Sequence, residues 1–237
     1  MKRKIIHVII LFISMTVFSQ NNEIGVFIGG SNYIGDVGPT TYIHPFSYNL
    51  STNAVAGIIF RKNLNERIAL RAKLNYSKIG SSDNWPNTVE YRNKRGRYFK
   101  NVLTEFGVGI DFNFVEFDIY NSSLQMTPYI STGINFFNYN ALRYEIGELK
   151  ADQYGTESNI SVPITLGYKL KPLRSFIIGF EITANSTFTD NLDGSYPIDK
   201  YKDSSEIFGS TLSKDWYVFS GITLTYLFGN KKCYCPN

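Results

Sequence analysis

Cys233 and Cys235 are the only two cysteines of the 237-residue chain, and a single tyrosine separates them. Three kinds of chemistry fit this spacing. A local disulfide would close a tight, strained ring that is readily reduced. A metal site would need further ligands, because zinc usually takes four. Pairing with the thiol of a partner protein suits a terminal segment, and the preceding Lys231 and Lys232 would favour the reactive thiolate and an acidic partner surface.

The compartment of these thiols depends on the other end of the chain. The sequence opens with the basic stretch MKRK and continues as an apolar run from Ile5 to Phe18, with Val17 and Ser19 as small residues before a cut. This order predicts a secretory signal peptide over residues 1–19. The apolar run has about 14 residues, whereas a spanning helix needs about 20, so a retained signal anchor is the weaker alternative. Export would bring the cysteines into an oxidising space, where thiols do not stay free by default.

Charge and composition exclude some classes of function. The formal net charge of +4 falls to about +1 without the signal peptide, because Lys2, Arg3 and Lys4 leave with it. A chain so close to neutral is not expected to bind nucleic acid. The longest uncharged stretch, 119–142, is interrupted by polar residues and proline, so no membrane helix is expected in the mature chain.

The mature chain alternates between apolar and polar residues with a period of two, which predicts β-strands. In the segment 67–78, for example, Ile68, Leu70 and Leu74 fall on one face, and Arg71 and Lys73 fall on the other. The same pattern predicts five clear strands and three weaker ones, in the segments 67–78, 99–114, 158–170, 175–186 and 215–228, and 23–31, 52–61 and 124–137.

The connections between these strands alternate in length. Short links at 61–66, 115–123 and 171–174 alternate with stretches of roughly 20 residues or more, against a usual two to six. Short turns at one end and long loops at the other are typical of outer-membrane barrels. We therefore predict an all-β fold, an eight-stranded antiparallel transmembrane β-barrel over residues 20–228. Its short turns would face the periplasm and its long loops the exterior, with a periplasmic tail at 229–237.

A soluble barrel of the lipocalin kind is the alternative, because alternation does not tell inside from outside. Strand length, loop asymmetry and aromatic residues near strand ends favour the membrane; these aromatics are Tyr76, Phe114, Tyr168, Phe176, Trp216 and Phe228. The polar faces then point into a lumen just wide enough for side chains. We expect an internal plug of ion pairs and no open pore, from the residues Arg71, Lys73, Lys169, Glu105, Asp111 and Glu181.

Two stretches resemble a known family. The segment 23–38 contains GGSNYIGD, and the chain ends in DWYVFSGITLTYLFGNKKCYC followed by Pro-Asn. Together with the eight-strand layout they resemble the PorG-like outer-membrane proteins of the type IX secretion apparatus of Bacteroidetes. The residues of the first stretch that carry the resemblance are Gly29, Gly30, Tyr33, Gly35 and Asp36. A plainer interpretation is that the glycines permit a bend and that the tyrosine and the aspartate anchor the first long loop.

The resemblance implies a non-enzymatic role. Such proteins are thought to hold a periplasmic ring, built from a lipoprotein and its partner, against the outer membrane and its lipid. By this analogy Cys233 and Cys235 are candidates for a link to the ring lipoprotein. The turn at 115–123, with Phe117, Ile119 and Tyr120, would add non-covalent contacts, unless it is only a solvated connection.

Two other classes of function were weighed. An acyl-transfer enzyme needs a nucleophile and a base, but His44 and Ser47 are three residues apart in an extended loop without a third member, so no catalytic, metal or cofactor site is predicted. The alternative function is a surface barrel that binds a ligand or lipopolysaccharide through its long loops. The run at 89–97 supports it or is only a solvated loop; its cations are Arg92, Lys94, Arg95 and Arg97. A periplasmic scaffold should tolerate trimming of loops 80–96 and 189–212, whereas a surface receptor should not.

Overall fold

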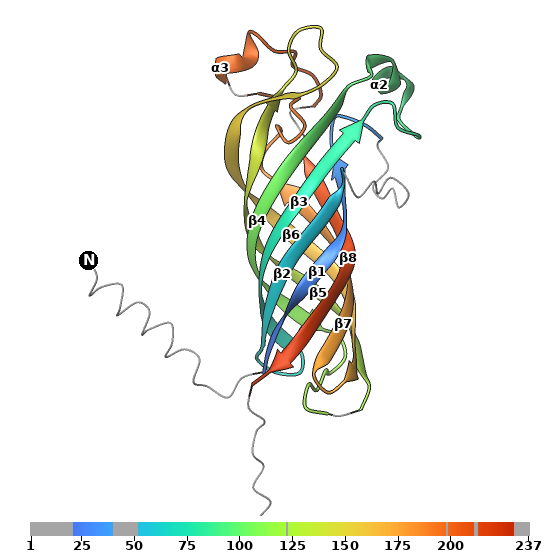
Figure 1. Cartoon of the computed structure of the whole chain (residues 1–237), viewed down its shortest axis with the longest axis vertical. Coiled ribbons are helices and arrows are strands. Elements are labelled where there is room, and N and C mark those ends of the chain that lie inside the picture. Colours follow the sequence, from blue (N-terminus) through green and yellow to red (C-terminus); the bar gives the residue numbers. More distant parts are fainter. Residues whose placement is uncertain (1–20, 40–51, 122, 198, 211–212, 230–237) are drawn as a thin grey trace, which may run out of the picture.

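The computed structural model describes residues 21–39, 52–121, 123–197, 199–210 and 213–229, and it shows a closed barrel of eight strands (Figure 1). Each strand pairs antiparallel with its neighbour in the chain, and β1 pairs with β8 to close the wall. The strands are β1 (Asn21–Ile34), β2 (Ala54–Asn63), β3 (Ile68–Ser82), β4 (Tyr98–Asn113), β5 (Gln125–Arg143), β6 (Asp152–Leu173), β7 (Phe176–Thr187) and β8 (Trp216–Phe228).

The wall has an apolar outside and a polar inside. Even-numbered residues face outward: on β4, for example, Phe106, Val108 and Ile110 are about half exposed, while the odd-numbered Glu105 and Asp111 are buried in the lumen. A soluble lipocalin-like barrel would have the opposite arrangement, so this alternative is wrong. The belt of exposed apolar side chains runs round all eight strands, as hydrocarbon requires of a barrel. The six aromatic residues predicted near strand ends are all exposed.

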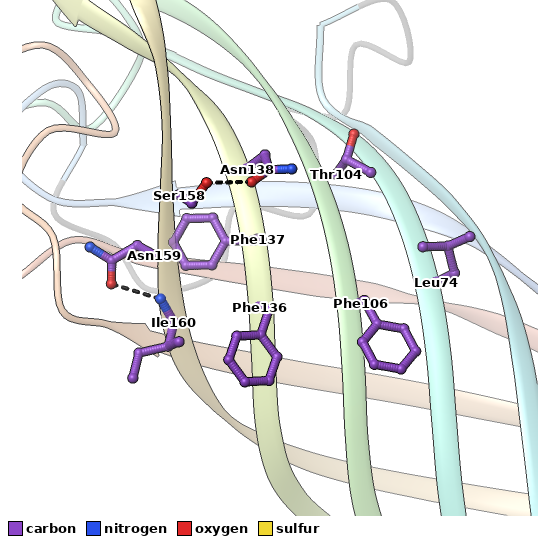
Figure 2. A pocket seen from close by; sticks show the side chains of 9 residues that line it. All are labelled: Leu74, Thr104, Phe106, Phe136, Phe137, Asn138, Ser158, Asn159 and Ile160. Atoms are coloured by element: carbon purple, nitrogen blue, oxygen red, sulfur yellow. Dashed lines mark hydrogen bonds between the residues drawn. The ribbon is translucent and has the colours of Figure 1, made fainter. Parts of the chain in front are cut away.

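The upper edge of this belt is sharp on β4 and β5. Phe106 and Phe136 are followed toward the long loops by Thr104 and Asn138 (Figure 2). Beyond this line the wall continues as a polar extension of the same strands. The barrel therefore projects beyond its own apolar belt on the side of the long loops.

The seam between β1 and β8 requires glycine at one point. Gly29 lies opposite Gly221, and a Cβ atom on Gly29 would lie 2.2 Å from the carbonyl oxygen of Ser220. A Cβ atom on Gly221 would meet the backbone of Ile28 at 2.3 Å. These glycines allow a close approach of two backbones at the closing seam.

Two strands are longer than the sequence pattern predicted. β5 has 19 residues and β6 has 22, and their pairing continues from Gln125↔Lys171 to Arg143↔Asp152, with a register shift between Ala141 and Leu142. The connection between them is reduced to residues 144–151. The prediction of four connections of roughly 20 residues or more is thus wrong for this one.

The barrel has two different ends. The turn end contains residues 64–67, 114–124 and 174–175, together with the start of β1 and the end of β8. The loop end contains residues 83–97, 144–151 and 188–215 together with the described part of 35–53, and it includes α2 (Glu90–Arg95) and α3 (Asp199–Lys202) (Figure 1). Neither helix of the described chain is long and apolar enough to cross a membrane. The apolar core lies inside the barrel near the loop end, where Phe99, Phe137 and Tyr217 pack together with Tyr33.

Candidate functional site

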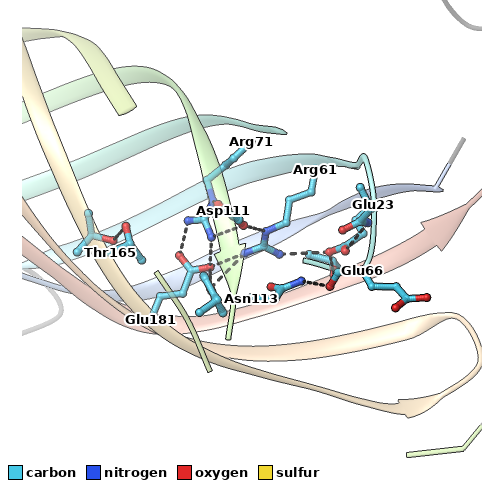
Figure 3. Close-up of polar contacts among 12 residues, drawn as sticks. Glu23, Arg61, Glu66, Arg71, Asp111, Asn113, Thr165 and Glu181 are labelled. Atoms are coloured by element: carbon cyan, nitrogen blue, oxygen red, sulfur yellow. Dashed lines mark hydrogen bonds and ion pairs between the residues drawn. The ribbon is translucent and has the colours of Figure 1, made fainter. Parts of the chain in front are cut away.

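A network of ion pairs fills the lumen near the turn end (Figure 3). Arg61 contacts three carboxylates: Asp111 at 2.9 Å, Glu181 at 2.5 Å and Glu23 at 3.3 Å. Arg71 contacts two of them, Asp111 at 2.7 Å and Glu181 at 3.0 Å. The side chains of this network are almost fully buried, so each charge is compensated mainly by its ion-pair partners.

Polar neighbours complete the network. Asn63 donates to Glu23 at 2.8 Å, and the Tyr129 hydroxyl donates to Glu181. Lys169 adds a third cation to the two arginines and so balances the three carboxylates. Its ammonium group is buried and lies 4.8 Å from the centre of the Phe117 ring.

A second layer lies above the first, in the direction of the loop end. Glu105 forms an ion pair with Lys73 at 3.3 Å and accepts hydrogen bonds from Asn75 at 2.9 Å and Asn135 at 3.0 Å. The Tyr217 hydroxyl donates to the same carboxylate at 2.5 Å. A cavity of about 10 Å³ next to these residues is at the lower limit for one water molecule. The predicted plug is confirmed, and the sequence missed two of its members, Glu23 and Arg61.

The turn end is closed by the connection between β4 and β5. The Lys171 ammonium donates to the carbonyl oxygens of Asp118, Ile119 at 2.7 Å, and Asn121, and so fixes this turn from beneath. Phe117 is only 2% exposed, because it folds inward over Lys169. Its prediction as an exposed docking residue is therefore wrong.

The rest of that turn faces outward only in part. Ile119 is half-buried, and Tyr120 is 40% exposed. Arg67 ties the neighbouring turn to this one through an ion pair with Glu116 at 3.1 Å and a hydrogen bond to the Phe114 carbonyl at 3.0 Å. The turn end is consequently a preformed surface with Tyr120 at its exposed part.

The residues of the GGSNYIGD stretch lie at the loop end and assemble the loops there. The Tyr33 hydroxyl donates to Asp215 at 2.6 Å and accepts from the backbone N–H of Asp36 at 3.2 Å. A Cβ atom on Gly35 would lie 1.9 Å from this hydroxyl oxygen, so only glycine fits. Asp36 in turn accepts from the backbone N–H of Ser210 at 3.3 Å. The stretch anchors the loops, as the plainer interpretation of the sequence held.

Two buried carboxyl groups meet beneath these loops. Asp193 and Asp215 are each 1% exposed or less, and the Tyr33 hydroxyl donates to Asp215. Burial and their mutual repulsion raise the pKa of Asp215 well above its usual value, and burial raises the pKa of Asp193 to about 6. Two carboxylates buried this deeply repel each other, so the pair favours holding a further proton.

The basic run at 89–97 does not form an exposed cationic patch. Arg92 is buried and donates to the carbonyl oxygens of Gly35 at 2.9 Å and Gly38 at 3.0 Å. Arg95 forms an ion pair with Asp83 at 2.7 Å, and its guanidinium lies over a phenylalanine ring. The other two cations of the run are also paired: Arg97 with Glu206, and Lys94 with Glu90 at 2.8 Å. Three guanidinium groups therefore hold the loops together, which removes the support for a ligand site built on this run.

Several predicted site residues lie outside the described part of the chain. They are the candidate tether residues Lys231, Lys232, Cys233 and Cys235, the enzyme candidates His44 and Ser47, and the signal peptide at 1–19. Within the described ranges, no group of three or more histidine, cysteine or acidic side chains is arranged to hold a metal ion.

Comparison with known sequences assigns the chain to a family. A family model described as a domain of unknown function (DUF6089) matches residues 2–237. The chain belongs to the DUF6089 family. No curated protein matches this DUF6089 sequence.

Solved structures of small outer-membrane barrels resemble this DUF6089 barrel. Neisserial surface protein A (NspA) is 8% identical with a TM-score of 0.49, over 87% of this chain and 97% of the other. Ail of Yersinia pestis, in complex with the heparin analogue sucrose octasulfate, is 11% identical with a TM-score of 0.45, over 89% and 100%. The N-terminal barrel of Pseudomonas aeruginosa OprF is 14% identical with a TM-score of 0.41, over 87% and 98%. Likenesses this distant carry no argument about function.

Proposed function

We propose that this protein is a non-enzymatic outer-membrane anchor of a type IX-like secretion machine, which holds a periplasmic ring of a lipoprotein and its partner at the turn end. The observation that carries a non-transport role is the filled lumen. Arg61 and Arg71 are locked to three carboxylates, and Phe117 covers the turn end. A barrel closed in this way offers a solute no path, so its use must lie on its outer surfaces and its two ends.

The turn end suits attachment better than the loop end. Its surface is held in place by Lys171 and by the Arg67–Glu116 ion pair, so a partner would meet a preformed shape. Tyr120 supplies an exposed aromatic side chain, a type that is frequent at interface hot spots. β8 ends at Phe228 on this side, and the chain that carries Cys233 and Cys235 leaves the barrel from there.

The first experiment tests whether Cys233 or Cys235 forms a disulfide with a partner protein. Free thiols are blocked when the cells are lysed. Outer membranes from cells that carry the full-length tagged chain are run on non-reducing and reducing gels, beside Cys233→Ser and Cys235→Ser variants. We expect a heavier band that is lost on reduction and in a cysteine variant, and mass spectrometry of it should identify a periplasmic lipoprotein. A single monomer band in every lane would contradict a covalent tether.

The non-covalent contact needs a separate variant. Tyr120→Ser should reduce recovery of the ring proteins with the tagged chain after reduction, and a matched exposed residue at the loop end, Ile146→Ser, should not. Equal recovery from both variants would argue against docking at the turn end.

Loop trimming is a poorer test than the sequence suggested. Residues 80–96 include Asp83, which holds Arg95, and residues 189–212 include Leu192 of the buried core. Their removal would disturb the fold whatever the function is. Point substitutions of exposed side chains therefore separate an anchor from a surface receptor more cleanly.

A further inference from the structure

Two adjacent strands carry exposed lysines on their outer face above the apolar belt. On β3 the outward residue after Tyr76 is Lys78, and on β4 the first outward charge after Phe106 is Lys100; both lysines are exposed. The outward residues just above the belt on the six other strands are uncharged: Gly30 and Asn32, Ala56 and Ala54, Asn138 and Asn140, Ser158 and Thr156, Ala184 and Ser186, and Ser220 and Val218.

The strand register places the two lysines next to each other. Lys78 pairs with Val102, and Lys100 pairs with Gly80, so the lysines are diagonal neighbours on the same face. Such neighbours are roughly 7 Å apart, close enough for two ammonium groups to contact one phosphate group. Neither lysine takes part in an ion pair within the described chain. The site therefore presents two positive charges that are not engaged in an ion pair with any carboxylate of the described residues.

A groove in the outer wall lies within the belt, and the outward residues Tyr76 on β3 and Val102 on β4 separate it from the two lysines. Its volume is about 440 Å³, within the usual range for ligand sites. Leu74, Phe106, Phe136 and Ile160 form its apolar part, and Ser158 lies at its polar rim (Figure 2). The Ser158 hydroxyl donates to the side-chain oxygen of Asn138 at 2.7 Å, which leaves the amide hydrogens of that asparagine for a ligand.

We propose that this surface binds a phosphorylated, acylated lipid of the outer leaflet, with Lys78 and Lys100 on its phosphate and one acyl chain in the groove. The order of groups toward the loop end carries the inference: an apolar groove within the belt, hydrogen-bonding groups at its rim, and paired cations farther out on β3 and β4. A lipid with a phosphorylated headgroup has the same order. The inference rests on the membrane placement in the proposed function, but not on the ring or on the cysteines.

Lys78 and Lys100 should each strengthen lipid binding by a similar, measurable factor. A lysine near a charged membrane surface strengthens binding by about fivefold, so loss of both should weaken it by roughly 25-fold. Lys62 is a matched control, because it is an outward-facing lysine on β2 near the turn end, at the opposite edge of the belt.

The test is native mass spectrometry of the full chain, folded in detergent and titrated with a diphosphorylated lipid A-type lipid. The same lipid without phosphate and an excess of inorganic phosphate are the other two arms. We expect a lipid adduct that weakens roughly 25-fold in the Lys78→Gln/Lys100→Gln double variant. The Lys62→Gln variant should bind the diphosphorylated lipid as tightly as the unmodified chain does. The lipid without phosphate should bind equally to the unmodified chain and to the Lys78→Gln/Lys100→Gln double variant. Inorganic phosphate should compete only weakly, because it lacks an acyl chain.

Each other result would overturn a distinct part of the proposal. Equal binding of the diphosphorylated lipid by the double variant and the Lys62→Gln control would overturn the phosphate site. Full displacement by inorganic phosphate would overturn the role of the groove. A heat-induced shift in gel mobility verifies that each variant forms the barrel. Absence of this shift in the unmodified chain would contradict the membrane placement itself, whereas loss of the lipid site alone would leave the ring proposal intact.

Discussion

Glu181→Gln should destabilise the barrel strongly, because this carboxylate is shared by both buried arginines. It lies 2.5 Å from Arg61 and 3.0 Å from Arg71, and it also accepts a hydrogen bond from Tyr129. Glutamine preserves the shape and one acceptor oxygen but removes the charge. The lumen layer would then hold three cations against the two remaining carboxylates, in a site that is closed to water.

The expected loss in free energy of unfolding follows from the burial of the ion pairs of Glu181. Removing one partner of a buried ion pair costs about 3 to 5 kcal/mol, because the other charge is left uncompensated. The exposed pair of Lys94 and Glu90 on α2 is a matched control, since its side chains are 75% and 83% exposed. Lys94→Gln should cost no more than about 0.5 kcal/mol.

The free energy of unfolding is measured by urea titration of the chain in lipid vesicles, with tryptophan fluorescence as the signal. A second substitution, Arg71→Gln in the Glu181→Gln background, restores the charge balance and should recover more than about 1 kcal/mol relative to additive costs. A cost for Glu181→Gln below about 1 kcal/mol would refute the reasoning. It would mean that water enters the lumen and screens the charges, and the barrel would then have to be treated as a narrow channel.

Three further predictions concern the two ends. The pKa of Asp193 is raised to about 6 and that of Asp215 is raised well above its usual value, so the folded loop end binds protons that the unfolded chain releases above about pH 4. Its stability should therefore fall as pH rises from about 4 through 6 and beyond, and Asp193→Asn should flatten the dependence of the thermal midpoint on pH. Phe117→Ala should cost about 3 to 5 kcal/mol in urea titration and should raise single-channel conductance in planar bilayers, since the ring covers Lys169. Gly35→Ala should displace the Tyr33 hydroxyl and speed proteolysis at the loop end, whereas the barrel itself should keep its heat-modifiable mobility.

The barrel was predictable because membrane and lumen impose opposite demands on adjacent residues. Every outward apolar residue that alternation assigned on β4, from Phe106 to Phe114, is exposed. The pattern fades where the strands leave the belt: on β5 the outward residues become Asn138 and Asn140, and without hydrocarbon to face there is no apolar period to read. The sequence pattern therefore indicates a long loop where the upper parts of β5 and β6 lie.

The internal charges were predictable strand by strand, but their pairing was not. Arg71, Asp111 and Glu181 stand out as charges on polar faces of clear strands. Glu23 and Arg61 lie at the same odd-numbered positions of β1 and β2, whose weaker alternation hid them. Which charges meet depends on the stagger of the closed wall, and that stagger is not a local property of any segment.

The turn end was mispredicted for a different reason. A hydrophobic residue in a short connection normally suggests an exposed side chain, and Phe117 was interpreted in this way. The lumen of a narrow barrel leaves its last cation, Lys169, without a hydrogen-bond partner within the described chain, and an aromatic face is the group that can cover it. The residue that looks like a docking group is thus required by the barrel itself.

The motif residues at the loop end have a structural role, and they are not the surfaces on which a partner would bind. Tyr33, Gly35 and Asp36, part of the GGSNYIGD stretch, assemble the loop end, at the opposite end of the barrel from Phe228, where β8 ends. Their contacts run to buried backbone and carboxyl groups and leave no side chain of the three for a partner. A motif of this kind therefore reports how the loops are held, and the search for partners should begin with the surfaces it does not occupy: the lysine pair on β3 and β4, and the exposed part of the turn end around Tyr120.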